Sequence, residues 1–252
     1  MKQENHSSAF VANPSVPEGL AVYAVGDIHG RLDLLDRLLS TIATDVSVTS
    51  PLQVSVVFLG DMVDRGPDSR GVIDRLAAGP PPTLSGAEWV CLRGNHEEAM
   101  QDFLADSSTG GRWFPWGGLE TVRSYVGEEA MLGWRGDMAE AQLSFRRHVP
   151  TSHRRFLDNL KLTHQIGDYL FVHAGIKPGV ALDQQHPADL LWIRHEFLDD
   201  ERWHGRMVVH GHTPDLQPQV RSNRLGIDTM AYDSGVLTAL ALRGSTRRFL
   251  HT

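Results

Sequence analysis

Apolar runs and helical periodicity alternate over the first hundred residues of the chain, and each apolar run ends in polar side chains. Residues 20–25 form such a run, and the apolar positions of residues 32–42 then recur at helical spacing. The same order of strand and helix returns after residues 54–59 and after residues 88–92. This alternation predicts three β-strand–α-helix units and therefore a parallel sheet.

The pattern changes after residue 106. Residues 107–160 combine glycine, tryptophan and helical periodicity, which predicts a helical excursion from the sheet. Its tryptophans either pack these helices together or wall a substrate groove. Later apolar runs with tight turns predict strands at 162–165, 169–172, 207–209, 220–227, 235–242 and 247–250. Strand–helix units first and strands last favour two facing sheets in one domain, residues 20–252.

Composition limits the classes of protein and partner. The 252 residues are 41% hydrophobic and 22% charged, as in ordinary soluble domains. A net charge of −7 argues against a nucleic-acid-coating surface. One cysteine, Cys91 in an apolar run, and the lack of an apolar signal or membrane segment predict a cytoplasmic protein without a membrane partner. Residues 1–19 are polar and predict a flexible N-terminal arm.

Polar side chains follow the predicted strands at the point where each strand ends. They are oxygen or imidazole donors, with no thiolate among them: Asp27, His29, Asp61, Asn95, His173 and His212. This donor set suits Mn²⁺, Fe or Zn²⁺ and disfavours iron–sulfur clusters or copper. Six ligands that share one carboxylate suit two metal ions about 3.5–4 Å apart, which stabilise in-line displacement at phosphorus.

Each of these residues also has a structural interpretation. Asp27 and Asn95 are suitable helix caps, and a single histidine at a strand end is more often structural than a ligand. Taken alone, residues 60–66, Gly-Asp-Met-Val-Asp-Arg-Gly, suit a turn with a solvated ion pair as well as a phosphate site. The repetition of polar motifs at successive strand ends favours the metal site.

Five motifs, in this order, resemble those of the calcineurin-like metallophosphoesterases. They are Gly-Asp-Ile-His-Gly (26–30), Gly-Asp-Met-Val-Asp-Arg-Gly (60–66), Arg-Gly-Asn-His-Glu (93–97), His-Ala-Gly (173–175) and Gly-His-Thr-Pro (211–214). Within that group they are most similar to the phosphoprotein phosphatases of the bacterial and bacteriophage-lambda branch. The resemblance spans residues 20–242 and implies an α/β fold, a four-layer αββα sandwich of two mixed β-sheets flanked by helices.

The resemblance also implies roles for individual residues. Asp27 and His29 would bind one metal, Asp61 would bridge, and Asn95, His173 and His212 would complete the second site. A hydroxide between the metals would attack phosphorus in line. His96, oriented by Asp64, would protonate the leaving oxygen, which an imidazole paired to a carboxylate does near neutral pH. Arg65 and Arg194 would clamp the phosphate, next to Asn95 and His96.

Two positions depart from related patterns. Pro214 stands where broader phosphodiesterase relatives have a second metal-binding histidine, which favours the phosphatase branch. Met230 stands where the branch usually has glycine, which leaves the substrate preference open. His210 has no ligand counterpart and is expected behind the metal ligands or at a strand end. Asp228 either supports the site from behind its ligands or forms a turn.

The leading hypothesis is a phosphomonoesterase with two divalent metal ions, most simply Mn²⁺, that acts on phosphoserine and phosphothreonine in proteins. The alternatives are hydrolysis of symmetrical dinucleoside tetraphosphates or of a small phosphate ester. A polyphosphate chain would need a basic pocket, for which the excursion offers Arg112, Arg123, Arg146, Arg147 and Arg154. A catalytically dead binding module is disfavoured because every ligand position is filled. The sequence does not specify an oligomeric state.

Overall fold

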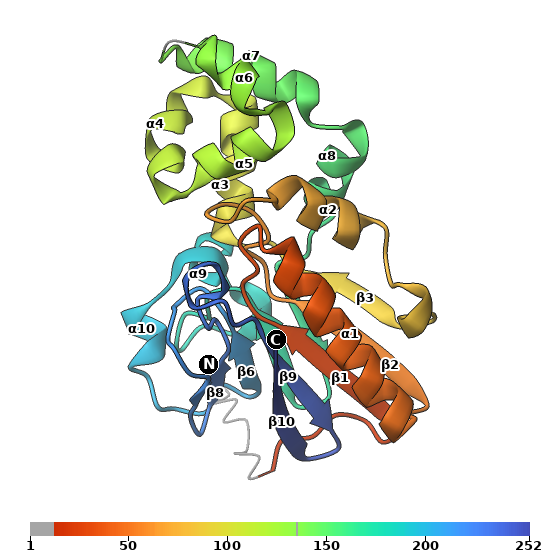
Figure 1. The fold of residues 1–252 in the computed structure, drawn as a ribbon. Helices are drawn as coiled ribbons and strands as arrows, with labels where there is room; N and C mark the ends of the chain where they lie inside the picture. Colours follow the sequence, from red (N-terminus) through yellow and green to blue (C-terminus); the bar gives the residue numbers. More distant parts are fainter. Residues whose placement is uncertain (1–12, 135) are drawn as a thin grey trace.

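A computed structural model describes residues 13–134 and 136–252, and it places ten strands in two sheets (Figure 1). The first sheet has the order β10-β9-β1-β2-β3. Its strands are β1 (Leu20–Val25), β2 (Gln53–Phe58), β3 (Glu88–Cys91), β9 (Thr238–Arg243) and β10 (Thr246–His251). β1, β2 and β3 are parallel, as the strand–helix units predicted, and β9 and β10 extend the sheet in antiparallel fashion.

The second sheet has the order β4-β5-β6-β8-β7. Its strands are β4 (Thr163–Ile166), β5 (Tyr169–Val172), β6 (Met207–His210), β7 (Gln219–Val220) and β8 (Arg224–Gly226). The single strand predicted at 220–227 is wrong, because β7 and β8 form a hairpin instead. The Asn223 side chain donates to the carbonyls of Asp200 and Arg202, which holds the turn between the two short strands.

Alternating side chains divide the core into layers. Val57 on β2 and Phe171 on β5 lie in a buried cluster that both sheets share. Their neighbours point the other way, because successive strand residues face opposite sides of a sheet. Phe58 packs against the helices over the first sheet, and Leu170 packs against those over the second.

Helices cover both outer faces, which confirms the predicted four-layer αββα sandwich. The helices over the first sheet are α1 (Leu32–Thr49), α2 (Ser69–Ala77) and α3 (Asn95–Ala105), and those over the second are α9 (Pro187–Trp192) and α10 (His195–Leu198). A short α11 (Ala231–Ser234) precedes β9, and 3₁₀ turns lie at Pro82–Leu84 and Leu182–Gln184. Among the described residues, no helix is both long enough and apolar enough to cross a membrane.

The helical excursion forms a lobe beyond the two sheets (Figure 1). Its described elements are two 3₁₀ turns (Ser107–Thr109 and Phe114–Trp116) and the helices α4 (Gly110–Trp113), α5 (Gly118–Val126), α6 (Glu128–Leu132), α7 (Met138–His148) and α8 (Thr151–Asp158). The lobe meets the loop after β2, where the Arg65 N–H donates to the Gly117 carbonyl over 3.1 Å. It therefore lies at the carboxyl ends of the parallel strands.

The predicted arm, residues 1–19, is described only from residue 13. The Val16 side chain is 3% exposed, and its N–H donates to the Gly244 carbonyl. Ser15 donates to the Asp168 carboxylate, and the Tyr169 hydroxyl donates to the Pro14 carbonyl. Residues 14–16 are thus packed on the sandwich, while residues 1–12 lie outside the described range.

Candidate metal centre

Six predicted ligands converge at the strand ends, five of them in loops and Asn95 at the start of α3. Those from the first sheet follow β1, β2 and β3, and those from the second follow β5 and β6. Each is at most 5% exposed: Asp27, His29, Asp61, Asn95, His173 and His212. Two glycines permit this approach, since a Cβ on Gly94 would lie 2.1 Å from Asp61 Oδ1 and one on Gly211 would lie 1.9 Å from Asp27 Oδ1.

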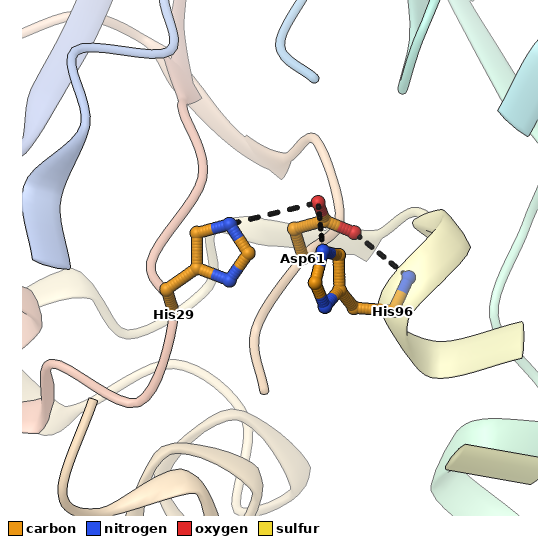
Figure 2. Close-up of side chains that lie close together, drawn as sticks. All are labelled: His29, Asp61 and His96. Atoms are coloured by element: carbon orange, nitrogen blue, oxygen red, sulfur yellow. Dashed lines mark hydrogen bonds and ion pairs between the residues drawn. The ribbon is translucent and has the colours of Figure 1, made fainter. Parts of the chain in front are cut away.

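Asp61 lies at the centre of the cluster. Its Oδ2 is 3.7 Å from His29 Nε2 and 3.8 Å from His96 Nε2, and its Oδ1 is 3.4 Å from His173 Nε2. Figure 2 shows His29 and His96 directed at the Asp61 carboxylate from either side. Two groups of possible ligand atoms therefore share this carboxylate: His29–Asp61–His96 and Asp61–His173–His212.

Hydrogen bonds set the histidine tautomers. His29 Nδ1 donates to the Val63 carbonyl over 2.9 Å, and His173 Nδ1 donates to the Leu59 carbonyl over 3.0 Å. Each ring therefore turns a lone pair on Nε2 toward Asp61. This carbonyl-held orientation is the usual arrangement behind metal-binding histidines.

Two acceptors then face each other without a proton between them, because His173 Nε2 lies 2.8 Å from Asn95 Oδ1. The His212 ring approaches the same oxygen, with its Nδ1 at 2.9 Å. Burial lowers the pKa of His173 and lowers that of His212 to about 2, so both rings are neutral. Lone pairs that converge in this way are stable beside a cation, and neutral imidazole is the form that binds metal.

Asp27 also lies where a bound cation would stabilise its negative charge. Its Oδ2 accepts from the His212 N–H over 3.0 Å, whereas Asp27 Oδ1 and His212 Nε2 are buried without a hydrogen-bond partner. Burial, together with the charges of Asp228 and Asp61, raises the pKa of Asp27 well above its ordinary value. A metal ion would offset this burial and repulsion, so the residues present fit a metal centre.

His96 differs from the proposed ligands. Its Nδ1 donates to Asp64 Oδ2 over 2.6 Å, and its Nε2 faces the cluster. Burial alone would lower the pKa of His96, but the Asp61 charge and the Asp64 hydrogen bond raise it above its ordinary value. A protonated imidazole oriented by a buried carboxylate is suited to donate a proton rather than to bind metal.

The two predicted phosphate-clamping arginines lie in different surroundings. One amino group of Arg65 lies 3.0 Å from His29 Nε2, and the other lies 3.4 Å from His96 Nε2. Its guanidinium also lies 4.5 Å from the centre of the Tyr232 ring. Arg194 is exposed and donates to Thr213 Oγ1 over 3.4 Å, one residue from His212. Arg65 thus lies within the cluster and Arg194 on its rim.

Backbone strain is concentrated at the same place. Five site residues have positive φ although none is glycine: His29, Asp61, Asp64, Arg65 and His212. Each such conformation costs about 1–3 kcal/mol and persists only where the surroundings hold it. Met230 also has φ of 56°, a conformation that glycine adopts more readily than methionine does.

Glu97 is a residue whose role the sequence did not reveal. It is fully buried, and its carboxylate accepts from the N–H groups of Asp61, Met62, Val63 and Gly94 at 2.7–3.2 Å. One side chain thus holds the Asp61 loop against the start of α3. Its position in the motif Arg-Gly-Asn-His-Glu was the only hint of a role in the sequence. Three of its four donors lie in the Asp61 loop, and only the folded chain brings them to Glu97.

The remaining predicted residues have clear surroundings. Trp113 is buried against Phe103 and Phe145, as the packing interpretation expected, while half-buried Trp116 lies 6.5 Å from the His96 ring.

His210 ends β6, buried against Phe197. Asp228 accepts from the Met230 N–H, so it forms a turn and also adds charge beside Asp27. Cys91 is half-buried, and burial raises the pKa of its thiol.

Comparison with known proteins gives consistent matches. A model of the calcineurin-like phosphoesterase family matches residues 20–237. Serine/threonine-protein phosphatase 1 of Salmonella typhimurium is 36% identical over 235 residues, which cover 86% of this chain and 89% of that protein. A symmetrical bis(5'-nucleosyl)-tetraphosphatase of an Acidovorax strain is 33% identical over 159 residues. That match covers 63% of this chain but only 45% of the relative's length.

A solved structure of a candidate diadenosine tetraphosphatase shares the fold. It superimposes with a TM-score of 0.60 at 22% identity and covers 96% of this chain and 98% of its own. The two-sheet architecture therefore extends over nearly the whole length of both proteins.

Proposed function

The chain belongs to the calcineurin-like phosphoesterase family of metal-dependent hydrolases, and on this premise we propose that it removes phosphate from phosphoserine and phosphothreonine in proteins. The observation that carries the proposal is the His96–Asp64 pair, which lies beside two groups of ligand atoms that share Asp61. A serine/threonine-protein phosphatase that aligns over most of both chains supports this substrate class.

The proposed metal sites follow the donor set. Asp27, His29 and Asp61 would hold one divalent ion, and Asp61 with Asn95, His173 and His212 would hold the other. We propose Mn²⁺, and Fe or Zn²⁺ also suit oxygen and imidazole ligands. When bound, the ions supply Lewis-acid charge to the phosphoryl oxygens and lower the pKa of water.

The protein's own side chains perform the remaining steps. Arg65 and Arg194 bind phosphoryl oxygens and stabilise the charge that develops on them. His96 holds a proton at Nε2, on the side of the ring that faces Asp61, and gives it to the leaving serine or threonine oxygen. Asp64 accepts from Nδ1 of the same ring and keeps Nε2 directed at the phosphate.

A second candidate, hydrolysis of dinucleoside polyphosphates, is favoured by aromatic side chains beside the site. Trp116 and Trp192 lie 5.4 Å apart, and Trp192 lies 6.3 Å from the His212 ring. A nucleobase stacks on such rings with about 1–3 kcal/mol per base. Arg112 lies 5.5 Å from the Trp116 ring and offers positive charge nearby.

Rates on two substrates separate the candidates. The purified protein with Mn²⁺ would be given a phosphoserine peptide and diadenosine tetraphosphate at equal concentrations. We expect the larger kcat/KM on the peptide, with His96→Asn as the control for contaminating phosphatase. A much larger kcat/KM on the dinucleotide would reverse the ranking. No turnover of either substrate, or of an aryl phosphate, would contradict a phosphoesterase.

A further inference from the structure

Asp64 is held by more than its histidine. The residue is fully buried, and three side chains donate to its carboxylate. His96 Nδ1 and Trp113 Nε1 donate to Oδ2 over 2.6 and 2.7 Å, and Thr121 Oγ1 donates to Oδ1 over 2.6 Å. Both carboxylate oxygens are therefore fixed, and with them the plane in which His96 is oriented.

The protons of this network have one consistent assignment. A hydroxyl has a single proton, and the Thr121 hydroxyl gives it to Asp64 Oδ1. In the 2.9 Å contact between Ser69 Oγ and Thr121 Oγ1, Ser69 is then the donor. The Asp64 N–H donates to both hydroxyl oxygens, over 3.0 Å to Ser69 and 2.8 Å to Thr121. Every polar group of Asp64 that faces this network has a partner.

Thr121 thus contacts both the side chain and the backbone of Asp64. The backbone contact matters because Asp64 has a φ of 74°, which non-glycine residues rarely adopt. The next residue, Arg65, also has positive φ, and its N–H donates to the Gly117 carbonyl. The conformation that aims Asp64 at His96 is therefore stabilised from α5 and from the turn before it.

Neither Trp113 nor Thr121 belongs to the two-sheet body. Both lie in the helical excursion, far in sequence from the motifs that supply the metal ligands and His96. A second polar contact secures the same helix one turn later, where the Tyr125 hydroxyl bonds His153 Nδ1 over 2.8 Å. His153 Nε2 in turn bonds Asp74 Oδ1 on α2 over 2.7 Å. The position of Thr121 is accordingly set by the packing of α5.

We propose that Thr121 and Trp113 are positioning residues for proton transfer: they fix the Asp64 carboxylate so that His96 presents its Nε2 proton to the leaving oxygen. The helical excursion then helps to orient the proton donor, in addition to packing beside the site. This inference rests on the proposed function because it assigns His96 as the acid of phosphate ester hydrolysis. It concerns the leaving-group step and not metal binding.

Leaving groups provide the first test. Thr121→Val keeps the shape of the side chain and removes the hydroxyl, Thr121→Ser restores it, and Trp113→Phe removes only the indole donor. We expect Thr121→Val and Trp113→Phe to lower kcat about tenfold or more on phenyl phosphate, whose leaving group needs a proton. The loss should be smaller on p-nitrophenyl phosphate, with KM and metal content nearly unchanged. Thr121→Ser should recover most of the rate.

An equal loss on both substrates would contradict the positioning role, because damage to the metal site or to the fold does not depend on the leaving group. Tyr125→Phe is the matched control. It lies one turn along the same helix and removes a buried hydrogen bond that does not touch Asp64. We expect its leaving-group dependence to equal that of the wild type.

A double-mutant cycle asks whether Thr121 acts through His96. In a His96→Asn background, Thr121→Val should change kcat on phenyl phosphate by less than about twofold, since the group it positions is already gone. A loss as large as in the wild-type background would mean that Thr121 acts on something other than His96 and would overturn the inference.

A spectroscopic measurement separates failure of this inference from failure of the proposed function. In the Zn²⁺-loaded protein, the proton between His96 Nδ1 and Asp64 should give a far-downfield ¹H signal, assigned by its loss in Asp64→Asn. We expect the signal to move in Thr121→Val and Trp113→Phe and to stay in Tyr125→Phe. This holds even if no phosphate ester is hydrolysed. An unmoved signal in both Thr121→Val and Trp113→Phe would refute the positioning role.

Discussion

The two-sheet body and the helical excursion contribute different things to one site. All six proposed metal ligands follow strands of the body, where Asp61 lies between His29 and His173. The excursion supplies no proposed ligand, but its Thr121 and Trp113 hold Asp64, and through it His96. In our proposal, metal binding and proton donation are therefore secured by different parts of the fold, which should make them separable by mutation.

The largest loss of metal and activity should follow a substitution in the two-sheet body. Asp61→Asn removes the carboxylate that both ligand groups share, so it should release metal from both positions. The fall in kcat should exceed the roughly 10²–10⁴-fold that loss of a general acid costs. Elemental analysis of the purified variant, together with kcat on an aryl phosphate, measures both quantities. Retention of two ions per chain would contradict Asp61 as the bridge.

His96→Asn should separate the two contributions. It removes the group that the excursion positions but none of the proposed ligands. We expect metal content close to that of the wild type and a loss of turnover of roughly 10²-fold or more. Full activity in this variant would show that His96 is not the acid, and loss of metal would show that the two functions are not separable.

Glu97→Gln should weaken the body without removing a ligand. The amide places a donor where four backbone N–H groups require acceptors, and such a mismatch costs about 1–3 kcal/mol of unfolding free energy. Denaturant unfolding of the metal-free protein would measure it. Exposed Glu129 provides the control substitution, Glu129→Gln, for which we expect no change. Equal stability of the two variants would contradict the structural role of Glu97.

The smallest effect should follow a substitution in the part of the helical excursion that does not contact Asp64. Tyr125→Phe removes the hydroxyl that bonds buried His153 and should cost about 0.5–1.5 kcal/mol of unfolding free energy. Its metal content should equal that of the wild type. Thermal unfolding and elemental analysis would measure both. A loss of metal in this variant would mean that the excursion also supports the metal centre. It would contradict the division of roles between the excursion and the two-sheet body.

Much of the site could be predicted from local sequence. Asp27, His29 and Asp61 are identified by short motifs at the ends of apolar runs, and parallel strands bring such ends to one edge of a sheet. The hairpin of β7 and β8 was predicted as a single strand, because the turn at Asn223 depends on carbonyls more than 20 residues away. The local sequence pattern predicts a helix or strand well when the residues of that element alone determine its conformation.

The sequence by itself determined the strand–helix order, the two facing sheets and the chemistry of the donor set, because hydrophobic period and residue type are local properties. Only the tertiary structure decided which groups hold those donors in place. Glu97, Thr121 and Trp113 act through contacts with residues 34–57 positions away in sequence, and no spacing rule records such contacts. A buried carboxylate needs several donors at once, and the folded chain alone brings them together.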